Sequence, residues 1–429
     1  MVENFFKLRE HNTDIRTEFL AGITTFLTMA YIIFVNPSIL AESGMDRNAV
    51  FVATCLAAAI GSAIMGIYAN YPFALAPGMG LNAYFTHGVV LGMGYTWQVA
   101  LGAVFLSGCI FIILSILPVR EWIVNAIPRS LKIAISAGIG LFLGVLSLKN
   151  AGIIVDHPAT LVGIGDLKRP EPLLAIFGFF AIAILSARRI SGAIILSVLG
   201  VTIIGVITGV SSISGVFSAP PSLTPTFMQM DVIGAINLGL VTIVFTFLFV
   251  DLFDTSGTLV GLAHRAGMLD ENSKVPRLRK ALMADGTATF AGAMLGTSTT
   301  TSYIESAAGI NVGGRTGLTA CVVSLLFLLC LFLAPLAGSI PAYATAPALL
   351  FISCLMVRGL SEIDWDDITD VAPAVIAAIS MPLTFSIATG IGFGFVAYAV
   401  IKTLAGRSDE AGVAVWVLAA LFILKFAMF

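Results

Sequence analysis

Long apolar runs, separated by short polar or charged stretches, make up most of the chain. A helix that crosses the hydrocarbon core of a bilayer, about 30 Å thick, needs about 20 mostly apolar residues. The runs therefore predict an all-α polytopic membrane protein. The full or nearly full candidate spans are 19–41, 47–68, 93–117, 130–148, 171–187, 190–210, 232–257, 281–296, 316–336, 341–357, 369–385 and 387–404.

Two further stretches, 71–90 and 297–312, are too interrupted by Pro, Gly, Ser or Thr to form one lipid-facing helix each. We expect each to form a short extended strand followed by a half-helix. Irregular backbone at membrane depth is tolerated only where protein or a water-filled cavity satisfies its polar groups. Both stretches are therefore expected at the centre of the molecule.

The distribution of Lys and Arg tests this count, because cytoplasmic loops carry an excess of both residues. Counting the interrupted stretches as crossings gives fourteen segments and places 18 of the 22 basic residues on the side of the N-terminus. Only Arg47, Lys149, Lys168 and Arg169 fall on the other side. The sequence thus predicts a multi-pass inner (plasma) membrane protein with both termini cytoplasmic. The last apolar run, 412–428, is expected to lie along the cytoplasmic interface.

The two halves of the chain, 1–210 and 232–404, each place their interrupted stretch third among seven segments. Because seven is an odd number, two such repeats sit in the membrane in opposite orientations. Inverted repeats with matched broken helices are typical of secondary transporters, whose substrate site lies near the midplane at the breaks. The site is therefore expected near 76–85 and 299–306.

Composition and charge exclude several other classes. The chain is 58% hydrophobic and only 11% charged, against about 25% charged residues in an average soluble protein. Its formal net charge of −2 provides no basic field for a nucleic acid. The five cysteines fall in apolar runs without a CxxC pair, so neither disulfides nor a zinc site is indicated. No cofactor or metal is expected.

Four of the 24 acidic residues, Asp251, Asp254, Asp285 and Glu305, lie inside apolar segments, and the other 20 lie in loops, at segment ends or in the tail. A carboxylate at the centre of a spanning helix costs about 2.5–3.5 kcal/mol, and no Lys or Arg in the same segments offsets this cost. Burial favours the neutral carboxyl group, so such an acid can take up and release a proton. The four acids are candidates for substrate binding and proton coupling.

The spacing of Asp251, Asp254 and Thr258 places them on one helix face, which must point inward. The alternative for both aspartates is a hydrogen bond that holds neighbouring helices together. Asp285 could likewise bond a neighbouring backbone donor. Glu305 falls in the first turn of the second half-helix, where free N–H groups stabilise an anion.

Hydroxyl groups precede Glu305, and we expect those of Thr299, Thr300, Thr301 and Ser302 to cap the second half-helix. The matching residues of the first half are Asn82 and Tyr84, for which a purely structural role is equally open. Two carboxylates near two helix N-termini favour a small, flat, neutral solute with paired N–H donors. The candidate substrate contacts are Asp254, Glu305, Asn82, Tyr84, Ser302, Tyr303 and Ile304.

At these motifs the chain resembles the AzgA-like purine branch of the nucleobase-cation symporters, within the nucleobase–ascorbate transporter superfamily. The resemblance runs almost end to end, through 24–37, 74–85, 251–259, 296–306 and 312–318. It implies the uracil-permease fold, with a core domain of segments 1–4 and 8–11 and a gate domain of segments 5–7 and 12–14. It also implies elevator-like proton symport of hypoxanthine, guanine or adenine, and a homodimer formed through the gate domain.

The same resemblance implies roles for single residues. Asp254 and Glu305 match the family's two base-binding acids. Thr258 stands where the uracil permease has a histidine implicated in proton handling, which is a departure from the pattern. Asp251 or Asp285 is therefore the candidate for proton coupling, with Glu305 or Asp254 sharing the proton as a further alternative.

Two other classes remain open. An intramembrane aspartyl protease would need two aspartates on facing helices, but the usual Gly-x-Gly-Asp setting is missing around Asp285. An anion exchanger or channel of the same fold would need a cation opposite the half-helices, and Asp254 and Glu305 would repel its substrate. The sequence therefore favours a transporter of neutral solutes over an enzyme.

Overall fold

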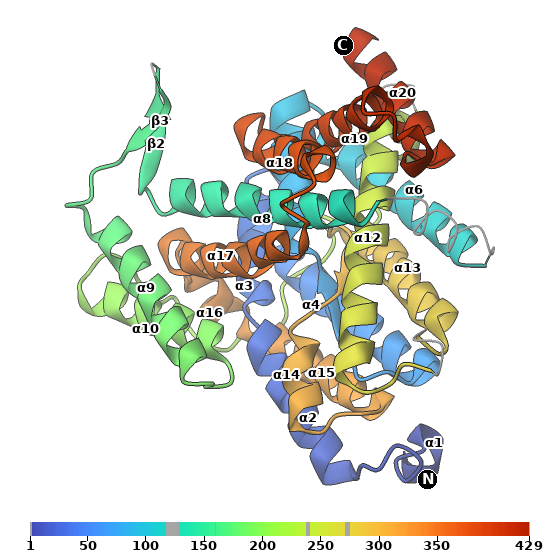
Figure 1. Ribbon diagram of the computed structural model, residues 1–429. Helices are drawn as coiled ribbons and strands as arrows, with labels where there is room; N and C mark the ends of the chain where they lie inside the picture. The colour runs from blue at the N-terminus through green and yellow to red at the C-terminus, as the bar shows by residue number, and fades with distance from the viewer. Residues whose placement is uncertain (1, 117–127, 159, 237–240, 271–274, 429) are drawn as a thin grey trace.

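The computed structural model describes residues 2–116, 128–158, 160–236, 241–270 and 275–428, which form a bundle of helices around a short central sheet (Figure 1). Parts of two predicted spans, residue 117 and residues 237–240, lie outside the described residues, as do Arg120 and Lys274 of the predicted cytoplasmic set.

The first half of the chain forms helices at the positions of its predicted spans. Asp14 caps the start of α2, where its side chain accepts a hydrogen bond from Thr17 N at 2.8 Å. The helix breaks at Ala30 and Tyr31 before α3 continues the same span. The helices are α1 (Val2–Phe6), α2 (Ile15–Met29), α3 (Ile32–Ala41), α4 (Arg47–Ile64), η1 (Met65–Ala69), α5 (Met79–Ala83), η2 (Tyr84–Gly92), α6 (Trp97–Ile116), α8 (Arg129–Asn150), α9 (Pro170–Ala187) and α10 (Ala193–Ile207).

The second half begins with the short α11 and ends with a helix that follows the last predicted segment. Its helices are α11 (Val232–Ala235), α12 (Val241–Arg265), α13 (Leu278–Leu295), α14 (Ser306–Val312), α15 (Gly317–Cys330), η3 (Leu331–Leu333), α16 (Ala334–Ser339), α17 (Ala342–Val357), η4 (Arg358–Glu362), α18 (Ile368–Leu383), α19 (Ile387–Leu404), η5 (Ser408–Glu410) and α20 (Val413–Met428).

Nine helical stretches in the described part of the chain are long and apolar enough to cross a membrane, and three shorter apolar helices accompany them. This pattern makes the protein a helical polytopic membrane protein. The nine are Ile15–Ala41, Arg47–Ala69, Trp97–Ile116, Arg129–Asn150, Pro170–Ala187, Ile243–Arg265, Gly317–Ser339, Ala342–Glu362 and Ile387–Leu404, and the shorter three are Ala193–Ile207, Ile368–Leu383 and Val413–Leu424.

The two interrupted stretches meet at the centre through a two-stranded antiparallel sheet. Strand β1 (Leu75–Pro77) pairs with β4 (Thr300–Ser302), with Leu75 opposite Ser302 and Pro77 opposite Thr300. All six residues are buried. Each strand leads into a short helix, α5 with η2 in the first half and α14 in the second. The predicted strand and half-helix are thus confirmed in both stretches.

Hydroxyl groups from neighbouring helices satisfy the backbone of these strands, as a buried irregular segment requires. Ser62 of α4 bonds both the N–H and the carbonyl of Leu75, at 3.0 and 3.1 Å. Thr289 of α13 does the same for Thr300, at 3.2 and 2.9 Å. Ser306 Oγ accepts from Ala74 N at 3.0 Å. The small polar residues of these helices therefore complete the hydrogen bonding of the strands.

Glycine is required where β1 turns into α5. A Cβ at Gly78 would lie 2.9 Å from the Thr301 side chain, and one at Gly80 would lie 2.4 Å from Ile139 Cγ2. Contacts this short force the neighbours apart, so only glycine lets the backbone approach β4 and α8 this closely.

The helices pack in two sets. One set joins α2, α3, α4, α6, α12, α13, α14 and α15, and the other joins α8, α9, α10, α17, α18 and α19. In Figure 1, α12 runs along the middle of the molecule, with α13 on one side and α17 and α18 on the other. The central sheet belongs to the first set, and α8 approaches it through α5.

The last apolar run is a helix that packs against the second set. Phe393 of α19 and Phe426 of α20 place their ring centres 5.1 Å apart, and a Cβ at Gly392 would meet the ring of Phe422. Val415 is fully buried. One side of α20 is therefore covered by α19, while its predicted position along the cytoplasmic interface stays a prediction.

A β-hairpin that the apolar pattern did not predict follows α8. Strands β2 (Ile154–His157) and β3 (Leu161–Ile164) pair antiparallel and stand out from the helices at the upper left of Figure 1. The predicted topology treated this region only as an outer loop, because it lies between two candidate spans.

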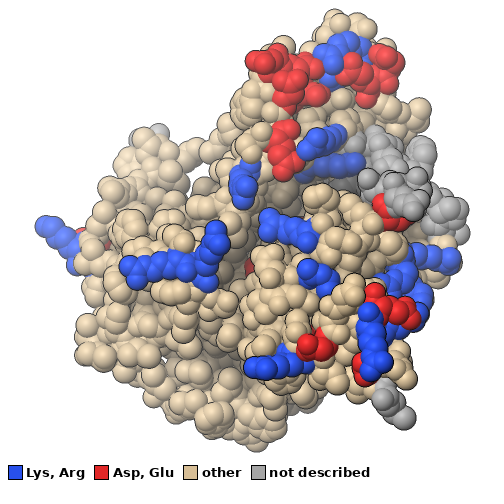
Figure 2. Space-filling model, turned by 60° about the horizontal axis from the view of Figure 1, so that its bottom comes forward, with Lys and Arg blue, Asp and Glu red and all other residues tan. Residues whose placement is uncertain are grey.

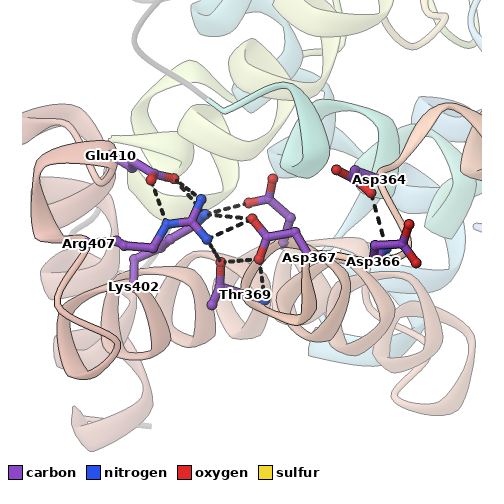
Figure 3. A network of polar contacts seen from close by, with 8 residues as sticks. Asp364, Asp366, Asp367, Thr369, Lys402, Arg407 and Glu410 are labelled. Carbon is purple, nitrogen blue, oxygen red and sulfur yellow. Dashed lines mark hydrogen bonds and ion pairs between the residues drawn. The ribbon is translucent and has the colours of Figure 1, made fainter.

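Charged side chains concentrate outside the central sheet. Figure 2 shows Lys and Arg spread over the face that carries the N-terminal end of the chain. A separate network links the start of α18 to the end of α19 (Figure 3). There Lys402, fully buried, contacts Glu410 at 2.7 Å and Asp370 at 3.0 Å, and Arg407 contacts Asp367 at 2.8 Å. These pairs fix the relative positions of the two helix ends.

Candidate functional site

The predicted site residues come from α12, α13 and the two interrupted stretches. Helix α12 contacts β4, α14 and α5, so it passes the point where the two half-helices begin. The predicted acids of α12 therefore lie beside both interrupted stretches, which are more than 160 residues apart in the sequence.

Glu305 occupies the N-cap position of α14, one residue before its predicted place in the first turn. The side chain does not cap the helix. Instead, its Oε1 accepts a hydrogen bond of 2.7 Å from Tyr31 Oη. Tyr31 is buried at the break between α2 and α3. This tyrosine orients the carboxylate, and the sequence analysis missed it, although a phenol inside an apolar run at a helix break is a recognisable signal.

Asp254 lies in the middle of α12 and is partly exposed. Helix α12, which carries Asp254, contacts α14, and Glu305 is the N-cap residue of α14. Among the described residues, neither acid lies within ion-pair distance of a Lys or Arg. Two carboxylate acceptors therefore come from elements that contact each other, where a neutral solute with N–H donors could bind.

Tyr303 and Ser302 hold the two interrupted stretches together. Tyr303 Oη donates to the Pro77 carbonyl at 2.6 Å, and its backbone N–H donates to Ala74 at 2.9 Å. Ser302 Oγ lies 3.4 Å from Asp285 Oδ1. Ile304 is 57% exposed. The polar groups of Tyr303 are thus engaged with the first half, which leaves its ring as the part that a solute could contact.

The expected capping of the second half-helix by the hydroxyls of 299–302 is wrong. Residues 300–302 are extended in β4, and α14 begins only at Ser306. A residue caps a helix from the position just before its first turn, and these hydroxyls lie three or more residues before that position. Ser302 instead turns toward α13, and the strand backbone takes its hydrogen bonds from β1 and Thr289.

The first-half residues approach the same region. Asn82 of α5 is fully buried, and its Oδ1 accepts a short hydrogen bond from Ser298 Oγ. Its Nδ2 has no hydrogen-bond partner among the described residues. Tyr84 packs its ring against Phe247 of α12, with the centroids 5.0 Å apart. Asn82 therefore offers a donor, while Tyr84 ties η2 to the helix that carries Asp254.

Asp251 and Asp285 form a separate buried group with three hydroxyls. Thr255 Oγ1 lies 3.0 Å from Asp285 Oδ2 and 3.4 Å from Asp251 Oδ1. Thr289 Oγ1 lies 3.5 Å from Asp251 Oδ2. The structure thus brings together the two candidates for coupling, although they lie on different helices. Thr255 was not predicted, because its partner on α13 cannot be read from helix spacing alone.

One further buried acid was missed. Glu18 was counted among the acids at segment ends, but it is fully buried. Its carboxylate accepts from the backbone N–H groups of Arg315 at 2.8 Å and Thr319 at 3.2 Å, and from Thr319 Oγ1 at 2.6 Å. It therefore caps the start of α15 from a different part of the chain, which is a structural role.

The fold and these polar groups at its centre are those of a membrane permease. A family model described as "Permease family" matches residues 16–393, and the chain belongs to that family.

Its relatives are similar along nearly their whole length. A putative permease, MJ0326, of Methanocaldococcus jannaschii is 55% identical over 99% of this chain and 98% of its own length. The adenine permease AdeP of Escherichia coli is 51% identical, covering 99% and 96%. The guanine/hypoxanthine permease PbuG of Bacillus subtilis is 44% identical, covering 99% of both chains.

A solved structure shares the fold at low sequence identity. The transmembrane domain of a cyanobacterial bicarbonate transporter, BicA, superposes with a TM-score of 0.65 and 18% identity, covering 89% of this chain and 97% of that one. The likeness concerns the fold alone.

Proposed function

We propose that this protein is a secondary active transporter that imports the purine nucleobases hypoxanthine, guanine and adenine by proton symport. The observation that carries the proposal is that Asp254 and Glu305, neither paired with a Lys or Arg among the described residues, come from α12 and the start of α14, which contact each other beside the β1–β4 sheet. A purine presents N–H donors along its edges, and a carboxylate accepts such donors strongly. The names of the relatives AdeP and PbuG support this substrate class.

The substrate contacts in this proposal are Asp254 and Glu305 with Asn82, whose Nδ2 can serve an acceptor atom of the base. The rings of Tyr84 and Tyr303 would line the site. Ser302 and Ile304 complete the predicted set, Ser302 through the strand that positions Glu305 and Ile304 through its exposed side chain.

The proposed architecture is fourteen segments in two inverted repeats, 1–210 and 232–404. The core domain would comprise segments 1–4 and 8–11, and the gate domain segments 5–7 and 12–14. The separate packing of the two helix sets supports this division. In an elevator-like cycle, the core domain would carry the site across the membrane against a fixed gate domain, which would also form the homodimer.

The proposed setting is the inner (plasma) membrane, with both termini cytoplasmic and α20 near the cytoplasmic interface. The basic residues on the face turned forward in Figure 2 agree with a cytoplasmic assignment of that face. The coupling ion would be a proton, held by Asp251 or Asp285, and the cycle would need no cofactor.

Uptake of radiolabelled hypoxanthine and adenine tests the proposal, in cells that lack their own purine transporters. We expect concentrative uptake that collapses when an uncoupler is added, and competition by unlabelled purines in a panel of bases. Competition would also rank hypoxanthine, guanine and adenine. Uptake that is insensitive to the uncoupler, or a lack of any purine uptake with the protein present in the membrane, would contradict it.

A second candidate is an anion transporter, a class that the sequence left open and whose fold BicA shares. The carboxylates of Asp254 and Glu305 oppose it, because they would repel an anion. The two candidates separate in one assay with reconstituted protein. Bicarbonate or chloride flux that purines do not inhibit would support the anion transporter, whereas purine flux without anion flux would exclude it.

A further inference from the structure

Thr255 lies between the two buried carboxylates of the candidate coupling group. Asp251 is one turn earlier on α12, and Asp285 faces it from α13, with exposed fractions of 1% and 0%. The Thr255 hydroxyl is 3.0 Å from an oxygen of Asp285 and 3.4 Å from an oxygen of Asp251. One hydroxyl therefore bridges two acids on neighbouring helices.

The chemistry of a hydroxyl group limits how this bridge is protonated. A hydroxyl has one proton to donate and two lone pairs that accept. It can donate to only one of the two acids, so its contact with the other is favourable only when that acid carries a proton and donates in turn. Two ionised carboxylates in apolar surroundings would also repel each other. The bridge therefore fits a pair of acids that holds one proton.

The distances indicate which acid holds this proton. Thr255 lies closer to Asp285 than to Asp251, so its proton points to Asp285. Thr289 Oγ1 lies 2.9 Å from the Thr300 carbonyl but 3.5 Å from Asp251, so its proton points to the carbonyl. A protonated Asp251 has one proton to donate, and Thr255 Oγ1, the nearer of the two hydroxyl oxygens, can then accept it.

The hydroxyl groups around Asp285, in contrast, can donate their protons to it. Ser302 Oγ lies 3.4 Å from its second oxygen and can donate to it, in addition to Thr255. Two donors stabilise an ionised carboxylate. The geometry thus matches a neutral Asp251 beside an ionised Asp285.

The geometry points to Thr255 as the proton relay of the transport cycle, passing the coupled proton between Asp251 and Asp285. This inference rests on the proposed proton symport. In the transfer, the Asp251 proton bonds to Thr255 Oγ1 while the Thr255 hydroxyl proton bonds to the Asp285 carboxylate. One proton thus moves from α12 to α13, and the hydroxyl is regenerated.

The relay connects to the purine region through β4. Protonation of Asp285 weakens its attraction for the Ser302 hydroxyl, and Ser302 belongs to the strand that leads to Glu305. The described contacts of the relay join Asp251 and Thr255 from α12, Asp285 and Thr289 from α13, and Ser302 from β4. Asp254, the next acid along α12, belongs with Glu305 to the proposed purine site. Thr255 therefore positions and passes a proton without touching the base.

The test uses the variant Thr255→Val, which keeps the shape of the side chain but removes the hydroxyl. Thr255→Ser restores the hydroxyl, and Thr202→Val is the matched control, because the buried Thr202 bonds only the Val198 carbonyl of its own helix, at 2.8 Å. Each is reconstituted in liposomes. Exchange of labelled against unlabelled purine measures binding and movement, and accumulation driven by an imposed proton gradient measures coupling.

We expect Thr255→Val to retain exchange but to accumulate no purine above the outside concentration. Thr255→Ser and Thr202→Val should both exchange purine and accumulate it above the outside concentration. The inference is overturned if Thr255→Val accumulates purine as the unchanged protein does, or if it loses exchange and accumulation together. Failure of the unchanged protein to couple purine to protons would instead refute the proposed function, so the two failures are distinguishable.

An infrared measurement tests the proton's position without transport. The C=O stretch of a protonated carboxyl group should be lost from the spectrum of the resting protein in Asp251→Asn and kept in Asp285→Asn. Loss in Asp285→Asn with retention in Asp251→Asn would reverse the assignment and overturn it.

Discussion

At the residue scale, the carboxylates inside the apolar bundle are the feature from which function follows. An ionised acid inside an apolar bundle is costly, so the contacts of each acid reveal its role. Glu18 accepts hydrogen bonds at the start of α15, and Asp251 and Asp285 both contact the Thr255 hydroxyl. Asp254 and Glu305 come from α12 and the start of α14, which contact each other. The last pair is the one that we propose a solute satisfies.

The first prediction concerns that pair. Asp254→Asn and Glu305→Gln each replace a charged acceptor by a neutral amide. Hydrogen bonds to charged groups contribute about 1.5–3 kcal/mol, so purine affinity should fall roughly 10- to 100-fold in each. Binding of labelled purine to purified protein measures this. Asp166→Asn, at an exposed loop position, is the control. Unchanged affinity in either site variant would refute the assignment.

Tyr31 leads to a second prediction. Tyr31→Phe removes the hydroxyl that orients Glu305 but keeps the ring. Losing one hydrogen bond of about 1 kcal/mol should weaken purine binding about fivefold while leaving the folded protein intact. The dissociation constant, measured beside thermal stability, checks this. An unchanged constant would mean that the Glu305 carboxylate is held in place without Tyr31.

A third prediction concerns Glu18, whose role is structural. Glu18→Gln places an amide N–H₂ against backbone N–H donors of the α15 start, so buried donors lose their acceptor. Such a loss costs about 1–3 kcal/mol. The midpoint temperature of thermal unfolding in detergent should decrease. The purine affinity of the protein that stays folded should not change. Glu10→Gln, at an exposed position, is the control. A change in affinity without a change in the midpoint would contradict this role.

Sequence reasoning found the four acids because a charged residue stands out in an apolar run. It could not find Tyr31, Thr255 or the role of Glu18, because each depends on a partner from another part of the chain. Tyr31 meets Glu305 across 274 residues, and Glu18 meets Thr319 across 301. Spacing along one helix carries no information about such contacts.

At the scale of elements, the β1–β4 sheet organises the centre of the molecule. The composition of 71–90 and 297–312 predicted both strands, because Pro, Gly, Ser and Thr interrupt a helix pattern. That the strands pair with each other, and that Ser62 and Thr289 complete their hydrogen bonds, follows only from the packing of α4 and α13 around them. The β2–β3 hairpin was missed for a different reason, since its strands are too short and exposed to stand out beside apolar spans.

The ionic network between α18 and α19 gives a prediction about pH (Figure 3). A hydrogen bond from the Thr369 hydroxyl, with the Arg407 guanidinium beside it, holds the pKa of Asp367 well below its usual range. A carboxyl group whose pKa is lower in the folded protein stabilises the fold above its unfolded pKa, near 4, and this stabilisation is lost as the pH falls through the folded pKa.

Thermal unfolding in detergent at several pH values measures this effect. For the unchanged protein, the midpoint temperature of unfolding should decrease as the pH is lowered below about 4. Asp367→Asn should lower this midpoint temperature at neutral pH and make it depend less on pH. Asp364→Asn, in the same loop, is the comparison. Equal pH dependence in Asp367→Asn and in the unchanged protein would contradict a stabilising role for this network.

At the scale of the whole molecule, two helix sets meet around a central sheet that carries the candidate site. The positions of most helices could be predicted, because a bilayer demands long apolar runs. Hydropathy does not say which spans touch, so the division into a core and a gate domain came from a family resemblance and stays a prediction. The proposed transport cycle is a movement of one set against the other, with the carboxylates of the first set carrying base and proton together.

Proton movement caused by purine tests this account most directly. Purified protein in liposomes that contain a pH-sensitive dye is mixed with hypoxanthine or adenine outside, with no gradient imposed. The account predicts acidification of the interior when a transported purine is added, much weaker acidification with Glu305→Gln at the same purine concentration, and none in empty liposomes. Purine entry without acidification of the interior would contradict the claim that base and proton cross together.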